Sequence, residues 1–348
     1  MPISISPRGE ERIRNGHPWI YRSDVVEVDA AGGDTVRVTS ARGRPIGYAL
    51  YSDRSEIAIR LLTRQDEAPT IETWRERIAA AIAYRATLRI DATTYRLVHG
   101  EGDRLPSLIV DRYGDYLVVQ TLSQGSDRML PQIVDVLVSI AQPAGILARN
   151  DPKVRALEGL EQKVEVLFGT VPESIEVREG RVSYEVDLYR GQKTGLFLDQ
   201  RENREAAARY ARGRLLDAFS YNGGFGLALA PLCDRVLAVD ISEEAVARIG
   251  ANRDSPIIFA GTGWAGRRSR AGNSMRQTRP FARWPANIRT SSRCESCGIR
   301  CRNYGLTISR LGATTATARR CGPMAPRPAV VRPARRNTCL VRPSGCAF

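Results

Sequence analysis

The fold is decided by residues 189–241, which read YRGQKTGLFLDQRENREAAARYARGRLLDAFSYNGGFGLALAPLCDRVLAVDI. An apolar run at Leu215–Phe219 is followed by the turn sequence Ser220–Gly224, and a second apolar run comes at Val236–Val239. Short apolar runs on either side of a glycine-rich turn are typical of buried parallel strands. We therefore predict a βαβ unit whose helix begins at Phe225 and ends at Ala230.

Asp240 ends the second predicted strand, 23 residues after Asp217. In open α/β sheets a ligand lies beyond the carboxyl ends of the strands, where glycine lets the backbone approach it and a carboxylate can bind a ribose diol. The turn reads Asn-Gly-Gly-Phe-Gly and does not match the G-x-G-x-x-G pattern that binds a pyrophosphate. The pattern favours S-adenosylmethionine over a dinucleotide, and a ligand-free βαβ unit with a tight turn is the structural alternative.

A second motif precedes the first strand. Gly191–Gly195 is a polar loop that leads into Leu196–Leu198, and Asp199 stands where a helix is expected to begin. Aspartate is a preferred N-cap residue, so we predict that Asp199 caps this helix. A capped helix end beside a glycine turn would form a cofactor pocket.

The motifs GQKTGLFLDQRENR and LLDAFSYNGGFGLALA together resemble the class I S-adenosylmethionine-dependent rRNA large-subunit methyltransferases, those that make 5-methylcytosine in 23S rRNA. The resemblance implies S-adenosylmethionine as cofactor and large-subunit rRNA as partner. It implies that Asp240 binds the ribose and that the turn lines the adenosine and methionine. The implied cofactor-binding residues are Lys193, Gly195, Asp199, Gln200, Arg204, Asp217, Phe219, Tyr221, Gly223, Gly224, Phe225, Asp240 and Ile241.

Residues 1–66 are predicted to form a small β-rich domain. A strand is expected at Asp34–Thr39, where apolar and polar residues alternate, and Pro45–Tyr51 follows as its partner after a turn at Ala41–Gly43. Ile57–Leu62 is expected to complete this set of strands. The preceding segment RIRNGHPWIY contains arginines beside aromatic residues, a combination that can hold phosphates and stack on bases. A β-barrel with a charged rim explains the same composition, but the segment resembles a PUA domain, an RNA-binding module. The RNA-binding candidates are Arg12, Arg14, His17 and Trp19.

Residues 70–180 are predicted to form an α+β middle domain. A hairpin is expected from Leu108–Val110 and Tyr116–Gln120, followed by a helix at 129–141 and a strand at Gly145–Arg149. The stretch RLVHGEGDRLPSLIVDRYGDYLVVQ is similar to the central domain of the same methyltransferase family, so the resemblance covers residues 8 to about 252. His99 and Asp103 lie in a polar loop and are expected to have a structural role.

Charge and cysteine content both change near residue 250. The chain has 348 residues and a net charge of +14, but residues 251–348 hold 19 arginines, no lysine and two acids. The first 250 residues therefore carry 33 basic and 36 acidic side chains. Six of the seven cysteines also follow residue 250, and the exception is Cys233. The basic composition belongs to the tail alone, and it does not by itself indicate that the front of the chain binds nucleic acid.

The tail has three interpretations. Its composition lacks periodic apolar residues, so it could be a disordered arginine-rich arm that binds RNA. Cys294, Cys297 and Cys301 could be three metal ligands, but no fourth ligand is evident. Finally, GC-rich codons translated out of frame yield Arg, Pro, Ala, Gly, Ser, Thr and Cys, which is the bias found here. We favour this frameshift and expect no metal site.

The resemblance implies a DPPxF-type loop and a late cysteine as the catalytic elements, and neither is present in this sequence. We therefore predict no catalytic residue and an inactive product. The alternatives are a non-enzymatic RNA-binding protein with a vestigial cofactor fold, and a methyltransferase with another acceptor. No apolar run is long enough for a membrane span, which predicts a cytoplasmic protein. The sequence does not predict the oligomeric state.

The predicted fold class is thus an α/β multidomain protein. It comprises a PUA-like β-barrel at 1–66, an α+β domain at 70–180, an incomplete Rossmann-like methyltransferase domain at 181–252 and a disordered tail at 253–348.

Overall fold

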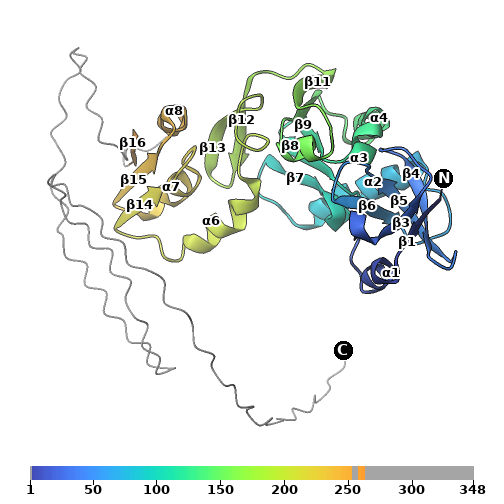
Figure 1. Ribbon diagram of the computed structural model, residues 1–348. Helices are drawn as coiled ribbons and strands as arrows, with labels where there is room; N and C mark the ends of the chain where they lie inside the picture. Colours follow the sequence, from blue (N-terminus) through green and yellow to red (C-terminus); the bar gives the residue numbers. More distant parts are fainter. Residues whose placement is uncertain (1, 253–257, 263–348) are drawn as a thin grey trace, which may run out of the picture. The chain divides into compact units, whose positions relative to one another are not determined.

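The computed structural model describes residues 2–252 and 258–262 (Figure 1). The chain divides into two units, 1–269 and 270–348, and every described residue belongs to the first. The predictions for the arginine-rich tail after Thr262, including the possible ligands Cys294, Cys297 and Cys301, lie outside the described residues.

The first domain is a six-stranded sheet with the strand order β2-β6-β5-β4-β1-β3. Its elements are β1 (Pro2–Ile5), α1 (Pro7–Arg14), β2 (Trp19–Tyr21), the 3-10 turn η1 (Arg22–Asp24), β3 (Val25–Val28), β4 (Thr35–Ser40), β5 (Pro45–Tyr51) and β6 (Ile57–Thr63). Strand β4 alternates between exposed and buried side chains as predicted, with Val36 and Val38 in the core. The three predicted strands are confirmed to within about one residue. The strand order ends at β2 and β3, so the predicted barrel is an open one.

The central domain has a five-stranded sheet in the order β11-β10-β9-β8-β7. Its elements are α2 (Ile71–Thr87), β7 (Thr94–His99), η2 (Gly100–Asp103), β8 (Leu108–Tyr113), β9 (Tyr116–Thr121), α3 (Gln124–Arg128), α4 (Leu130–Ala141), β10 (Gly145–Asn150), α5 (Val154–Leu157) and β11 (Lys163–Gly169). Helices α2 and α4 pack on one face through Trp74, Ile78 and Leu137. The predicted hairpin is present as β8 and β9, paired antiparallel.

A hairpin then connects this domain to the rest of the chain. It consists of β12 (Ser174–Glu179) and β13 (Val182–Asp187), so the predicted boundary at residue 180 falls within its turn. Tyr184 and Val186 of the hairpin share a buried cluster with Leu147 of the central sheet and Val236 of the following domain. The other face of the central sheet is therefore continuous with the core of the methyltransferase-like part.

The last described part is a parallel sheet in the order β14-β15-β16. Its elements are η3 (Leu198–Gln200), α6 (Arg201–Ala207), β14 (Arg214–Ala218), α7 (Gly224–Leu229), η4 (Ala230–Leu232), β15 (Arg235–Asp240), α8 (Glu243–Ala251) and β16 (Ile258–Thr262). The predicted strand–helix–strand unit is confirmed to within one or two residues. The sheet also continues past residue 252, because β16 pairs with β15 from Ile258 to Thr262.

Strand β14 is less buried than predicted. Leu216 is 56% exposed, and the exposed and half-buried side chains alternate along the strand. Within the described residues β14 is the edge strand of its sheet and pairs only with β15. An apolar sequence that suits a central strand thus lies at an open edge.

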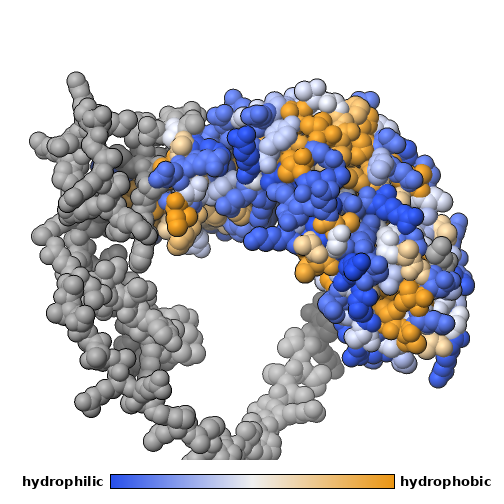
Figure 2. Space-filling view, turned by 45° about the horizontal axis from the view of Figure 1, so that its top comes forward, coloured by the Kyte–Doolittle hydropathy of each residue, from blue (hydrophilic) through white to orange (hydrophobic). Residues whose placement is uncertain are grey.

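None of the described helices is long and apolar enough to cross a membrane. On the face in Figure 2, apolar areas are separated by hydrophilic ones. Edge strand β11 contributes partly exposed apolar side chains, Val164, Val166 and Phe168. We assign no partner to them.

Candidate cofactor site

The turn after β14 has an unusual backbone. Phe219 and Tyr221 have left-handed φ values of +61° and +50°, and Gly223 follows at +81°. A left-handed conformation costs a non-glycine residue about 1–2 kcal/mol, and such residues cluster at functional sites. Phe219 is 92% exposed, whereas Tyr221 is buried. The turn therefore presents one aromatic ring to solvent and fixes the other against the protein.

Asp240 holds this turn from the end of β15. Its Oδ2 accepts a hydrogen bond from the Tyr221 backbone N–H at 2.7 Å, and its Oδ1 accepts one from the Ser242 N–H at 2.9 Å. Each carboxylate oxygen can accept a second hydrogen bond. The predicted ribose ligand Asp240 thus lies at the carboxyl end of its strand, oriented and with acceptor capacity left.

Asp217 lies beneath the turn. Its Oδ2 accepts a hydrogen bond from the Gly226 N–H at 2.8 Å, which fixes the first turn of α7. A Cβ at Gly226 would lie 3.0 Å from that oxygen. Burial, together with the neighbouring charge of Asp240, raises the pKa of Asp217, although the Gly226 hydrogen bond opposes the shift. This geometry gives Asp217 a positioning role.

The GQKTG loop lies directly against the turn. The Tyr221 hydroxyl accepts a hydrogen bond from the Gln192 N–H at 2.9 Å and donates one to the Gly195 carbonyl at 3.3 Å. The Phe197 ring packs edge-on against Tyr221, with ring centres 5.3 Å apart. The structure therefore brings the two sequence motifs together, with Tyr221 as the link.

The central domain anchors the same loop. Thr194 donates a hydrogen bond to Asp111 at 2.7 Å, and the buried Tyr113 hydroxyl lies 3.0 Å from the Thr194 hydroxyl and accepts the Leu196 N–H at 3.0 Å. Burial raises the pKa of Tyr113, so its hydroxyl stays neutral. Arg149 donates to the Gly191 carbonyl at 2.8 Å. These anchors could not be predicted from the sequence, because no local pattern links β8 and β10 to a loop far along the chain.

The predicted N-cap at Asp199 is wrong. Helix α6 begins at Arg201, and Gln200 occupies the cap position without a side-chain hydrogen bond to the backbone N–H groups of the helix. Asp199 instead forms an ion pair with Lys193 at 2.9 Å. Burial alone would raise the pKa of Asp199, but the hydrogen bond from Lys193 and the charge of that lysine lower the pKa below its usual value. The lysine also lies 4.4 Å from the centre of the Phe197 ring. The Asp199 carboxylate thus bonds to a lysine of the preceding loop and not to the helix backbone.

Arg204 lies behind the turn. Its guanidinium forms two 2.7 Å hydrogen bonds to the carboxylate of Glu179, and both side chains are buried. Its Nη1 would lie 3.1 Å from a Cβ at Gly224, and its Cζ is 5.9 Å from the centre of the Phe225 ring. Arg204 therefore supports Gly224 and Phe225 from inside.

The two remaining predicted cofactor residues lie at the surface of the site. Ile241 is 89% exposed and follows β15, and the Gln200 side chain accepts a hydrogen bond from Asn203.

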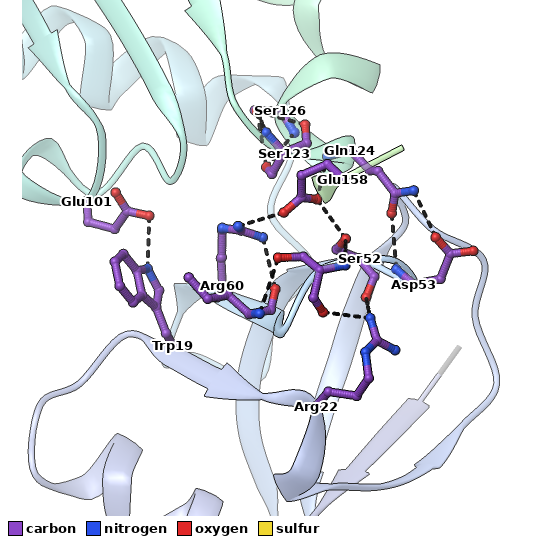
Figure 3. Close-up of polar contacts among 12 residues, drawn as sticks. Trp19, Arg22, Ser52, Asp53, Arg60, Glu101, Ser123, Gln124, Ser126 and Glu158 are labelled. Carbon is purple, nitrogen blue, oxygen red and sulfur yellow. Dashed lines mark hydrogen bonds and ion pairs between the residues drawn. The ribbon is translucent and has the colours of Figure 1, made fainter. Parts of the chain in front are cut away.

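The RNA-binding candidates are partly engaged within the protein. Arg12 lies 4.7 Å from the centre of the Tyr21 ring, and Arg14 pairs with Glu10 at 2.8 Å. His17 accepts a hydrogen bond from the Trp19 N–H at 3.2 Å. The indole N–H of Trp19 donates to Glu101 of the central domain at 3.0 Å (Figure 3). Trp19 thus lies at the junction of the two domains.

Two family matches fit this arrangement. Residues 3–64 match the family described as PUA-like domain, and residues 122–261 match the S-adenosylmethionine-dependent methyltransferases. The front of the chain is thus similar to PUA-like domains, and residues 122–261 are similar to S-adenosylmethionine-dependent methyltransferases. The second match ends at residue 261, so the methyltransferase sequence, like the sheet, extends beyond residue 252.

Curated relatives match about 70% of this chain. The ribosomal RNA large subunit methyltransferase I of Aliivibrio fischeri is 36% identical over 254 residues, which is 71% of this chain and 64% of the relative. The protein of the same name from Vibrio cholerae is 36% identical over 244 residues, covering 68% and 62%. The chain thus spans less than two thirds of the length of these relatives.

Solved methyltransferase structures share the fold. A putative S-adenosylmethionine-dependent methyltransferase from Streptococcus mutans has a TM-score of 0.65 at 21% identity, covering 76% of this chain and 70% of its own. A second putative methyltransferase, SMU.776, solved in complex with SAH, has a TM-score of 0.66 at 20% identity with the same coverage. The predicted PUA-like and Rossmann-like architecture is confirmed.

Proposed function

We propose that this chain belongs to an enzyme that transfers a methyl group from S-adenosylmethionine to C5 of a cytosine in large-subunit (23S) rRNA. The observation that carries the proposal is the hydrogen bond that the Asp240 carboxylate accepts from the Tyr221 N–H in the left-handed turn. This bond orients the carboxylate toward the position where a ribose diol would lie. The printed names of the relatives support rRNA as the substrate. The cytosine C5 position rests on the motif resemblance.

In this proposal the cofactor lies across the carboxyl ends of β14 and β15. Asp240 would accept hydrogen bonds from the ribose hydroxyls, and the exposed Phe219 ring would cover the adenosine. Gly223 and Gly224 would leave room for the ligand beside the start of α7. Lys193, Gly195 and Asp199 would close the site from the loop, with Gln200 and Ile241 at its edge. Arg204 and Asp217 would act indirectly, through Gly224 and Gly226.

The reaction needs catalytic motifs that this sequence lacks. C5 of cytosine becomes nucleophilic only when a thiolate adds to C6. C5 then takes the methyl group of S-adenosylmethionine, which leaves as S-adenosylhomocysteine, and a base removes the C5 proton as the thiolate is eliminated from C6. Cys233 does not suit this role, because it is buried between η4 and β15, at the amino end of the strand. Burial also raises the pKa of its thiol, so the thiolate is disfavoured. We infer that this chain binds the cofactor but does not complete the reaction.

Nucleoside mass spectrometry tests the acceptor. Unmodified 23S rRNA would be incubated with methyl-labelled S-adenosylmethionine and either this chain or a version with its reading frame restored after the codon for Gly261. We expect labelled 5-methylcytidine from the restored protein and none from the present chain. Label in another nucleoside would contradict the cytosine assignment, and labelled 5-methylcytidine from the present chain would contradict its proposed inactivity.

Resequencing the gene tests the proposed frameshift. The methyltransferase match runs to residue 261, so we look for an insertion or deletion in the codons that follow it. A corrected frame should contain a DPPxF loop and a late cysteine. An unchanged sequence would argue for a native arginine-rich tail.

A further inference from the structure

A cleft of about 670 Å³ lies where the PUA-like domain meets the central domain. It is bordered by the loop before β2, by the end of β6 and by η2. Its lining residues are Gly16, Pro18, Leu61, Leu62, Thr63, Arg64, Gln65, Arg77, Glu101 and Arg104. A second hollow of about 540 Å³ shares Thr63, Gln65, Arg77 and Arg104 with it. The two hollows therefore form one continuous surface.

The cleft is positively charged although the first 250 residues are not. Three arginines line it, Arg64 from the PUA-like domain and Arg77 and Arg104 from the central domain, against the single carboxylate of Glu101. Within the described residues none of the three forms a salt bridge. Arg64 donates to the Ile13 carbonyl at 2.9 Å, and Arg77 donates to the Arg104 carbonyl at 2.6 Å.

Nearby arginines are neutralised. Arg14 pairs with Glu10, and Arg37 pairs with Asp66. Glu101, the one acid of the cleft, already accepts the Trp19 indole N–H. Arg64, Arg77 and Arg104 thus lack, within the described residues, the carboxylate partners that Arg14 and Arg37 have.

Arg77 and Arg104 also repel each other. Burial and the charge of Arg104 both lower the pKa of Arg77, with a smaller opposing effect from Glu76. Placing like charges together without an anion destabilises the protein, and a bound anion removes that cost. Two adjacent guanidinium groups suit phosphate, since each can donate two parallel hydrogen bonds to it.

Ion pairs and hydrogen bonds join the PUA-like and central domains next to the cleft. Arg60 of β6 pairs with Glu158 at 2.7 Å, and both side chains are buried. Ser52 donates a hydrogen bond to the same carboxylate at 2.6 Å, and the Gln124 side chain donates to Asp53 at 2.8 Å (Figure 3). The bond from Trp19 to Glu101 closes the junction at the edge of the cleft. A preorganised site loses less conformational entropy on binding.

We propose that this cleft binds backbone phosphates of the RNA substrate, with Arg64 and Arg104 as the main contacts and Arg77 as their support. The inference rests on the proposed function, because it assumes that the substrate is RNA. The strand would run from the loop before Trp19 across the domain junction. The second hollow is less suited to phosphate, because Glu67, Glu72 and Glu76 line it.

Filter binding to unmodified transcribed 23S rRNA tests the proposal with the full chain. The variants are Arg64→Gln, Arg104→Gln and their combination, and Arg42→Gln is the matched control. Arg42 is exposed in the β4–β5 turn and lies outside the cleft. Its substitution removes one positive charge, as each of the single cleft variants does. Affinity would be measured between about 50 and 200 mM salt, where each phosphate contact contributes roughly 0.7–0.9 to the slope of log affinity against log salt.

We expect each single variant to lower that slope by about 1, and the double variant to bind on the order of tenfold more weakly at the lower salt. Arg104→Lys should keep the slope, because it keeps the charge, and Arg42→Gln should bind like the wild type. Melting curves check that the variants fold. If the double variant binds as tightly as the wild type with an unchanged slope, the proposal that the cleft binds phosphates is wrong, whereas the proposal that the substrate is RNA still holds. Failure of the wild type to bind rRNA would overturn both.

Discussion

At the residue scale, the site depends on positions where only glycine fits. Gly195 has a φ of +137°, and a Cβ there would lie 2.6 Å from the Val186 side chain. Gly195 also accepts the hydrogen bond from Tyr221 that joins the loop to the turn. The sequence motif predicted that this glycine matters but not why, because Val186 lies on the other side of the loop in a separate hairpin.

Gly195→Ala should therefore destabilise the protein. Strain and overpacking together should cost about 2 kcal/mol or more. Gly180→Ala is the control, since its φ is also positive but no atom lies within 4 Å of its Cβ position. The control should cost only about 1 kcal/mol. The free energy of unfolding in urea measures both, and equal effects would contradict the close packing of the loop.

Asp217 should make stability depend on pH. Its pKa in the folded protein is raised, chiefly by burial, so between its ordinary and its raised value the folded state holds the extra proton. Stability should then fall as pH rises through that interval, and Asp217→Asn should not show this fall. Melting temperatures of both proteins between about pH 4 and 7 provide the measurement. A difference between the two that does not grow with pH would contradict the burial of this carboxyl.

At the element scale, sequence patterns correctly predicted β4 to β6, β8 to β10 and the β14–α7–β15 unit, but not β1 to β3, β12 or β13. Alternation located β4, and apolar runs located β14 and β15, because these patterns reflect which face of an element is buried. The prediction failed where distant charges decide the structure. Asp199 does not cap α6, because it forms an ion pair with Lys193. Arg204 pairs with Glu179 and so joins α6 to the β12–β13 hairpin, within which the predicted domain boundary at residue 180 was placed.

The Arg204–Glu179 pair can be tested with a double-mutant cycle. Arg204→Met should leave Glu179 buried without a partner and cost about 3–5 kcal/mol. Adding Glu179→Leu should recover most of that loss, since a buried ion pair can be replaced by apolar side chains. Urea unfolding of the wild type, both single variants and the double variant gives the coupling energy. Additive effects would contradict a direct, buried ion pair.

At the scale of the whole molecule, net charge is a poor guide to RNA binding. The overall value of +14 comes from the tail, whereas the first 250 residues have slightly more acids than bases. The positive cleft arises because folding brings Arg64 beside Arg77 and Arg104 while other arginines are neutralised. The domain types and the cofactor turn were predictable from motifs, but this juxtaposition was not.

The central claim is that the turn at Phe219–Gly224 and Asp240 form an S-adenosylmethionine site. Calorimetric titration of the chain with S-adenosylmethionine tests it most directly, with Asp240→Ala and, as control, Glu243→Gln. Glu243 is an exposed acid three residues further on, so the control removes a nearby charge without removing a ribose ligand. Melting curves confirm folding, because Asp240→Ala also removes the acceptor of two backbone N–H groups.

We predict that the wild type binds the cofactor and that Glu243→Gln binds equally well. Asp240→Ala should weaken binding about tenfold or more, since each hydrogen bond to a charged group contributes about 1.5–3 kcal/mol. Absence of binding by the folded wild type, or equal affinity in folded Asp240→Ala, would contradict the assignment.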